Sequence, residues 1–209
     1  MLDAQFRRMI DPPLTRVGAV LARAGITANQ VTVGGFVIGV AAFPFLALQM
    51  YGWALACILL NRLADGLDGA VARAPVGGTG AAAGPSDLGG YLDITLDFIF
   101  YAGIPVAFAL GRPESAPVAA ILVFSFVGTM ASFLAFAIIA AKRGIVTEAR
   151  GRKTIYYLGG LAEGGETILF MVLICLLPDL FVWLAGGFTL LCWITTASRI
   201  AQAVQTFRA

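Results

Sequence analysis

Four aspartates, arranged in two pairs, are the residues of this 209-residue sequence best suited to chemistry. Asp65 and Asp68 are three residues apart and Asp93 and Asp97 are four apart, so each pair lies on one face of a helix. Carboxylates that share a site of low dielectric repel one another, so they either take up protons or bind cations. Because the sequence has no histidine, its oxygen ligands favour a hard divalent ion such as Mg²⁺ or Mn²⁺.

Two arginines flank the first aspartate pair. Arg62 lies one turn before Asp65, and Arg73 follows Asp68 near the end of the same predicted helix. Ion pairing with these arginines is the simpler explanation of the acidic residues, but it does not require four carboxylates. The one role expected for Arg62 is to balance the charge of the site when the metal is absent.

The elements that position the aspartates are predicted to be membrane helices. The chain is 59% hydrophobic and only 12% charged, whereas a soluble domain is about one quarter charged. The sequence therefore predicts an all-α integral membrane protein with a single domain, residues 1–209. Six segments approach the roughly 20 apolar residues that a transmembrane helix needs. They cover about 30–50, 52–73, 88–110, 115–141, 155–177 and 180–204.

A further helix is predicted before the first span. Residues 3–24 alternate apolar side chains with arginines, which is typical of an amphipathic helix lying in the membrane interface. Basic residues cluster in this segment, after the second span, between the fourth and fifth spans and at the carboxyl end. Because cytoplasmic segments are enriched in Lys and Arg, both termini and the aspartates are expected to face the cytoplasm, across the inner or plasma membrane if the protein is bacterial.

The residues around the aspartates resemble the signature of the CDP-alcohol phosphotransferase family. The matching positions are Asp65-x-x-Asp68-Gly69-x-x-Ala72-Arg73 and Gly89-x-x-x-Asp93-x-x-x-Asp97. The segment TANQVT at 27–32 is similar to the family's entry to its first span, with Ala28 in place of the usual proline. The chain departs from the pattern in a second respect: fifteen residues separate Arg73 from Gly89, more than is usual, and the excess falls in the Gly- and Ala-rich loop 74–86.

The resemblance implies transfer of a substituted phosphate from a CDP-alcohol to a second alcohol, with release of CMP. It implies two divalent cations held by Asp65, Asp68, Asp93 and Asp97, with Asp97 also taking the proton of the attacking hydroxyl. The residues expected to contact the CDP part are Gly69, Ala72, Arg73, Ser86 and Gly89, with Thr79 as the alternative to Ser86. It also implies a homodimer.

The substrates are less sharply predicted. CDP-diacylglycerol is the preferred donor, with a small soluble alcohol as acceptor, and no nucleic acid is expected as a partner. The candidate acceptor residues are Glu163, Glu166, Lys142, Arg143, Arg150, Arg152 and Lys153. For these residues, membrane topology, attraction to anionic lipids and simple solvation at the interface are competing explanations. Two other functions stay open: a soluble CDP-alcohol donor with a diacylglycerol-like acceptor, and, more remotely, a divalent-cation transporter.

Overall fold

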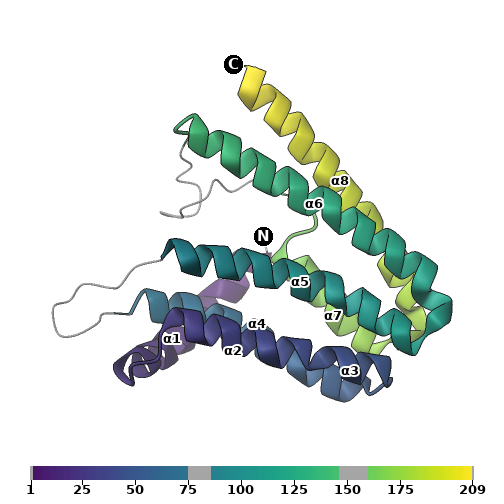
Figure 1. Ribbon diagram of the computed structural model, residues 1–209, viewed down its shortest axis with the longest axis horizontal. Helices are drawn as coiled ribbons and strands as arrows, with labels where there is room; N and C mark the ends of the chain where they lie inside the picture. The colour runs from purple at the N-terminus through teal and green to yellow at the C-terminus, as the bar shows by residue number, and fades with distance from the viewer. Residues whose placement is uncertain (1, 75–85, 146–159, 209) are drawn as a thin grey trace. The chain divides into compact units, whose positions relative to one another are not determined.

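The computed structural model describes residues 2–74, 86–145 and 160–208, with side chains from residue 12 onward. Every regular element in these ranges is a helix, which confirms the predicted all-α class (Figure 1). The chain divides into two compact units, Met1–Arg112 and Pro113–Ala209, which we call unit 1 and unit 2.

Unit 1 contains both aspartate pairs. Its helices are α1 (Leu2–Arg23), α2 (Ala28–Val40), α3 (Ala42–Ala47), α4 (Tyr51–Ala72) and α5 (Asp87–Gly111). Helix α4 packs against α1, α2 and α3, and α5 packs against α2 and α3. The TANQVT segment starts α2 with a capping box, in which Thr27 Oγ1 accepts from Gln30 N and Gln30 Oε1 accepts from Thr27 N.

Small residues let α2 and α1 approach α4 closely. A Cβ atom placed on Gly35 would lie 2.5 Å from Ala64 Cβ, and one on Gly18 would lie 2.7 Å from Ala70 Cβ. Interfaces between membrane helices are enriched in such small residues because they allow close backbone packing. Gly35 therefore sets how closely α2 approaches the helix that carries Asp65 and Asp68, and Gly18 does the same for α1.

Replacing Gly35 by valine is expected to destabilise unit 1. The added side chain would overlap Ala64, and overpacking of this kind costs about 1–3 kcal/mol. Thermal unfolding in detergent should show a lower midpoint for Gly35→Val than for the wild type. Gly34→Val is the matched control, because a Cβ atom at Gly34 has nothing within 4 Å. Equal midpoints for the two variants would contradict the expected overlap.

Unit 2 is built from two long helices that run parallel to each other and from a shorter helix. Its elements are the 3-10 turns Pro113–Ser115 and Pro178–Leu180 and the helices α6 (Ala116–Lys142), α7 (Gly164–Leu176) and α8 (Phe181–Arg208). Helix α8 packs against both α6 and α7. The Phe188 ring joins them, since it stacks on Phe170 of α7 at 4.8 Å and meets Phe126 of α6 edge-on at 6.1 Å.

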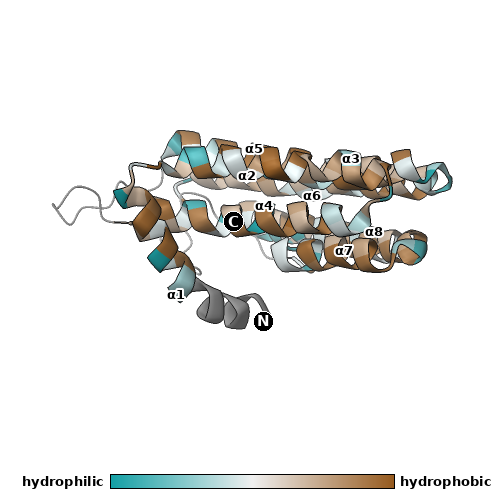
Figure 2. Cartoon of the chain, turned by 90° about the horizontal axis from the view of Figure 1, so that it is seen from below, coloured by the Kyte–Doolittle hydropathy of each residue, from teal (hydrophilic) through white to brown (hydrophobic). Residues whose placement is uncertain are grey.

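The described helices suit a membrane. Four segments are long and apolar enough to cross one: Ala28–Ala47, Asp87–Gly111, Pro113–Lys142 and Pro178–Arg208. Hydrophobic residues cover much of α3, α5 and α7 (Figure 2), and large apolar side chains such as Trp183 are exposed. Soluble proteins rarely present this much apolar surface, so the exterior matches lipid. Helix α4 has 22 residues but carries Arg62, Asp65 and Asp68, and it is not among these four segments. A count of six spans therefore stays a prediction.

The helix boundaries in the structure can be compared with three of the predicted segments. The amphipathic segment 3–24 forms helix α1, although its place in the interface stays a prediction. The predicted span 30–50 is two helices that meet at Ala41, because Pro44 has no N–H to donate to the Val40 carbonyl. The predicted span 155–177 starts too early, since residues 160–163 are not helical and α7 begins at Gly164. The loop 74–86 falls outside the described residues except for its two end positions.

Candidate functional site

Three of the four aspartates come together in unit 1. Asp65 of α4 and Asp93 and Asp97 of α5 each offer a carboxylate oxygen within 4.8 Å of the other two. The antiparallel course of α4 and α5 brings the two pairs together, as the sequence predicted. The narrow cavity at this point is also lined by Asp68 of α4 and by Thr32 of α2.

Asp68 lines the cavity but is not a member of the close group of three. Its Oδ2 accepts a 2.6 Å hydrogen bond from Thr32 Oγ1, and that hydroxyl also lies 3.1 Å from the Ala28 carbonyl oxygen. The expectation that all four carboxylates meet is therefore met for three of them. Thr32 was not predicted as a site residue, and the only signal for it was its position at the end of the TANQVT segment.

Arg62 lies in the site, in line with its expected role in balancing the charge, although the sequence did not show which carboxylates it contacts. Its side chain is only 7% exposed, and its Nη2 lies 2.7 Å from Asp97 Oδ1. Its Nη1 donates to the Tyr101 hydroxyl oxygen at 2.6 Å and lies 3.8 Å from Asp65 Oδ2. A guanidinium therefore lies inside the aspartate cluster, against two of its three carboxylates.

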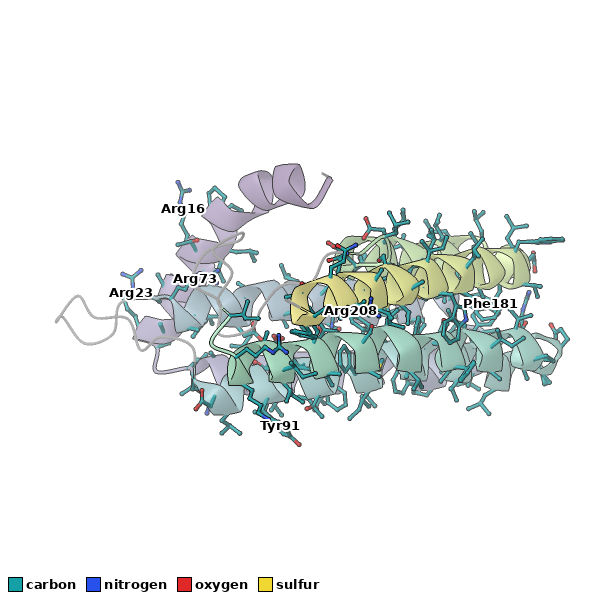
Figure 3. The ribbon with its side chains drawn as sticks, turned by 90° about the horizontal axis from the view of Figure 1, so that it is seen from above. Arg16, Arg23, Arg73, Tyr91, Phe181 and Arg208 are labelled. Atoms are coloured by element: carbon teal, nitrogen blue, oxygen red, sulfur yellow. The ribbon has the colours of Figure 1, made fainter. Side chains whose placement is uncertain are left out.

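The residues predicted to contact the CDP part lie at the ends of α4 and α5. The Arg73 guanidinium covers Gly69, since a Cβ atom there would lie 3.1 Å from Arg73 Nη1. The side chain of Arg73 is exposed, and Figure 3 shows it extending from the same end of unit 1 as Arg16 and Arg23 of α1. Ala72, at the end of α4, is half-buried.

Ser86 and Gly89 form the start of α5. Ser86 is the N-cap, and its Oγ accepts from Gly89 N at 3.0 Å. A Cβ atom on Gly89 would lie 3.0 Å from Asn29 Oδ1, so the starts of α2 and α5 meet at this glycine. The alternative to Ser86, Thr79, lies outside the described residues. Whether these residues contact a nucleotide stays a prediction.

Two of the acceptor candidates have a structural role in unit 2. Glu163 lies before α7 as its N-cap and not inside a span, and Glu166 Oε2 accepts from Glu163 N at 3.2 Å. The preceding turn is tied to α8, because Leu161 N and Ala162 N both donate to Thr195 Oγ1. Together these contacts explain why α7 begins at Gly164.

The basic acceptor candidates are only partly described. Lys142 is exposed at the end of α6. Arg143 donates from Nη2 to the Phe207 carbonyl oxygen at 2.9 Å, and its guanidinium lies over the Phe207 ring. Arg150, Arg152 and Lys153 lie outside the described residues. Unit 2 also has an open cavity of about 400 Å³ between α6 and α8, with largely apolar walls and with Arg199 and Arg208 among its lining residues.

The donor set of the aspartate site fits a hard divalent cation. Mg²⁺ and Mn²⁺ prefer oxygen ligands, and the close group of three supplies only carboxylate oxygens. Asp65, Asp93 and Asp97 are the residues placed to hold such an ion, with Asp68 beside them. The role of these residues as ligands, the identity of the ion and the number of ions stay predictions.

Comparison with known proteins identifies the family. Residues 25–200 match the sequence model of the CDP-alcohol phosphatidyltransferase family. The chain therefore belongs to this family, which confirms the resemblance seen in the aspartate signature. Transferase chemistry, phospholipid biosynthesis, a membrane location and metal binding all fit this membership.

Two relatives match over nearly their whole lengths. Inner membrane protein YnjF of Escherichia coli K12 is 49% identical over 209 residues, which cover 100% of this chain and 98% of that protein. Archaetidylinositol phosphate synthase of Pyrococcus horikoshii is 32% identical over 202 residues, covering 96% of this chain and 95% of that protein.

Solved structures share the fold. The phosphatidylinositol phosphate synthase of Mycobacterium tuberculosis, in complex with manganese and citrate, has a TM-score of 0.69 at 18% identity. The match covers 91% of this chain and 88% of that chain. The structure of the same synthase with CDP-DAG bound has a TM-score of 0.64 at 20% identity. The match covers 91% of this chain and 93% of that chain. At these identities the likeness establishes the fold alone.

Proposed function

We propose that this protein transfers the phosphatidyl group of CDP-diacylglycerol to a hydroxyl of a small acceptor alcohol and releases CMP. The observation that carries this proposal is the group formed by Asp65, Asp93 and Asp97 on two helices of a chain that belongs to the CDP-alcohol phosphatidyltransferases. The lipid donor is supported by the apolar exterior, because a lipid substrate reaches the site from the bilayer.

The proposed reaction assigns one step to the residues of unit 1. The acceptor hydroxyl oxygen forms a bond to the phosphorus that carries the lipid, and the bond from that phosphorus to the bridging oxygen breaks. CMP leaves with the electron pair, and the hydroxyl proton passes to Asp97. When bound, divalent cations would neutralise charge on the pyrophosphate oxygens. In this proposal Arg73, which is exposed at the end of α4, pairs with a phosphate oxygen.

The acceptor is proposed to carry a phosphate. One relative is an archaetidylinositol phosphate synthase, which makes inositol phosphate the first acceptor to test, followed by glycerol 3-phosphate. We also propose that the aspartate site and both termini face the cytoplasm, which is where a soluble acceptor is available. The basic residues of the sequence support this orientation.

The test is release of CMP by the purified protein in detergent with Mn²⁺ or Mg²⁺. We expect CMP from CDP-diacylglycerol only when an acceptor is present, and a fall to background when EDTA removes the metal. A parallel reaction with CDP-choline and diacylglycerol examines the opposite arrangement of donor and acceptor.

Each outcome of this assay bears on a different part of the proposal. Release from CDP-choline and none from CDP-diacylglycerol would replace the lipid donor by a soluble one. Turnover that persists in EDTA would contradict the metal-dependent site. No CMP from either donor with any acceptor tested would overturn the proposed function.

A further inference from the structure

Arg62 is held in the aspartate site by more than its ion pair with Asp97. Its Nε donates to Asn61 Oδ1 at 2.8 Å, and its Nη1 donates to the Tyr101 hydroxyl oxygen at 2.6 Å. Its guanidinium also lies over the rings of Phe100 and Tyr101, at 5.1 and 5.0 Å from their centres. These neutral groups fix the cation whether or not Asp97 stays paired with it.

The support for Arg62 extends to the α2 backbone. Asn61 is buried, and its Nδ2 donates to the Gly35 carbonyl oxygen at 2.9 Å, which leaves its Oδ1 directed to Arg62. Gly35 also lies close to α4, since a Cβ atom there would be 2.5 Å from Ala64 Cβ. The position of the guanidinium is therefore set by the packing of two helices.

Asp97 is restrained by this fixed cation at both of its oxygens. Oδ1 lies 2.7 Å from Arg62 Nη2, while Oδ2 lies 3.4 Å from Nη1 and accepts from the Tyr101 hydroxyl at 3.1 Å. An aspartate without these bonds would be free to turn toward an ion held by Asp65 and Asp93, because their ligand oxygens lie within 4.8 Å of its own. Each carboxylate oxygen has two lone pairs, so acceptor capacity remains on Asp97.

We propose that Arg62 is a built-in cation of the aspartate site that weakens the binding of divalent metal and holds Asp97 in the orientation that receives the acceptor proton. Its positive charge, 2.7 Å from Asp97 and 3.8 Å from Asp65, opposes a divalent ion between the same carboxylates. Arg62 is thus a positioning residue that acts through Asp97. The second part of this proposal rests on the proposed function, whereas the effect on metal affinity does not.

The experiment compares Arg62→Gln, Arg62→Lys and the wild type in two measurements. Mn²⁺ binding to the substrate-free protein is followed by electron paramagnetic resonance, and CMP release is followed at saturating metal. For Arg62→Gln we expect Mn²⁺ to bind about tenfold more tightly, because a positive charge has left the site. We expect kcat to fall about a hundredfold, because Asp97 is no longer oriented, with KM for the donor within about threefold of the wild-type value.

Arg62→Lys separates charge from geometry. It keeps the positive charge but not the planar fork, so Mn²⁺ affinity should stay within about threefold of the wild type while kcat still falls about tenfold. The matched control is Arg112→Gln, at the end of α5, where the guanidinium lies over Tyr51 instead of in the aspartate site. This control should change neither measurement.

A purely structural role for Arg62 predicts a different result. General loosening of the site would weaken Mn²⁺ binding and turnover together, and that outcome for Arg62→Gln would overturn the proposal. Wild-type kcat in Arg62→Lys would overturn the orienting role as well, and this variant decides the matter if Arg62→Gln does not fold. If the wild type releases no CMP from any donor, the proposed function fails, yet the Mn²⁺ affinities still decide whether Arg62 opposes the metal.

Discussion

Replacing Asp65 by asparagine is expected to reduce CMP release by about a thousandfold, since stabilisation by a bound metal is worth several kcal/mol and each 1.36 kcal/mol is a factor of ten. Asp65 belongs to the close group with Asp93 and Asp97, so no nearby carboxylate in that group can replace it without moving. Asparagine keeps the size of the side chain but removes its negative charge. The measurement is CMP release over a range of Mn²⁺ concentrations, combined with Mn²⁺ binding to the substrate-free protein.

The two readouts should change together in Asp65→Asn. Mn²⁺ should bind more weakly, and raising its concentration should restore part of the lost turnover. Asp87→Asn is the matched control, because Asp87 is exposed in the first turn of α5 and is not in the close group of three. Wild-type Mn²⁺ affinity in Asp65→Asn would rule out Asp65 as a ligand, even if turnover were lost.

Replacing Asp97 by asparagine is expected to reduce turnover about a hundredfold to ten thousandfold, by a different route. Removal of a general base has an effect of this size, and asparagine cannot take the proton of the acceptor hydroxyl. The loss should persist at saturating Mn²⁺, because restoring metal occupancy does not replace the missing proton acceptor. The measurement is kcat at saturating metal and substrates.

Comparison with Asp65→Asn makes this second prediction specific. High Mn²⁺ should rescue Asp65→Asn in part but not Asp97→Asn. The amide introduced by Asp97→Asn still offers one oxygen to the Arg62 guanidinium, so the unfolding midpoint in detergent should remain close to that of the wild type. Full recovery of Asp97→Asn at high Mn²⁺ would make Asp97 a metal ligand only, and the proton would then need another acceptor.

Helix periodicity predicted those features of the site that depend on residues a few positions apart. The intervals within Asp65–Asp68 and Asp93–Asp97 place each pair on one helix face, and two consecutive membrane helices run in opposite directions. The start of α2 also depends on a local feature, because Thr27 and Gln30 form a capping box within one turn. Such features depend on residues a few positions apart, so they can be read directly from the sequence.

The start of α7 differs from the prediction because it depends on an N-cap and on a contact between distant segments. The predicted span 155–177 begins too early, because Glu163 is an N-cap and α7 begins only at Gly164. The turn before it is held by Thr195 of α8, more than thirty residues away. The spacing of two glutamates does not by itself distinguish an N-cap from a helix face.

The sequence by itself determined the chemistry of this protein: an apolar helical chain, oxygen ligands without histidine, and aspartates spaced for two facing helices. Only the tertiary structure decided how these carboxylates are engaged. Asp68 is tied to Thr32 of α2, and Arg62 reaches Asp97 across 35 positions of the chain. The physical reason is that helix periodicity sets which side chains share a face, whereas the partner of a buried charge is set by which helices pack together and how closely.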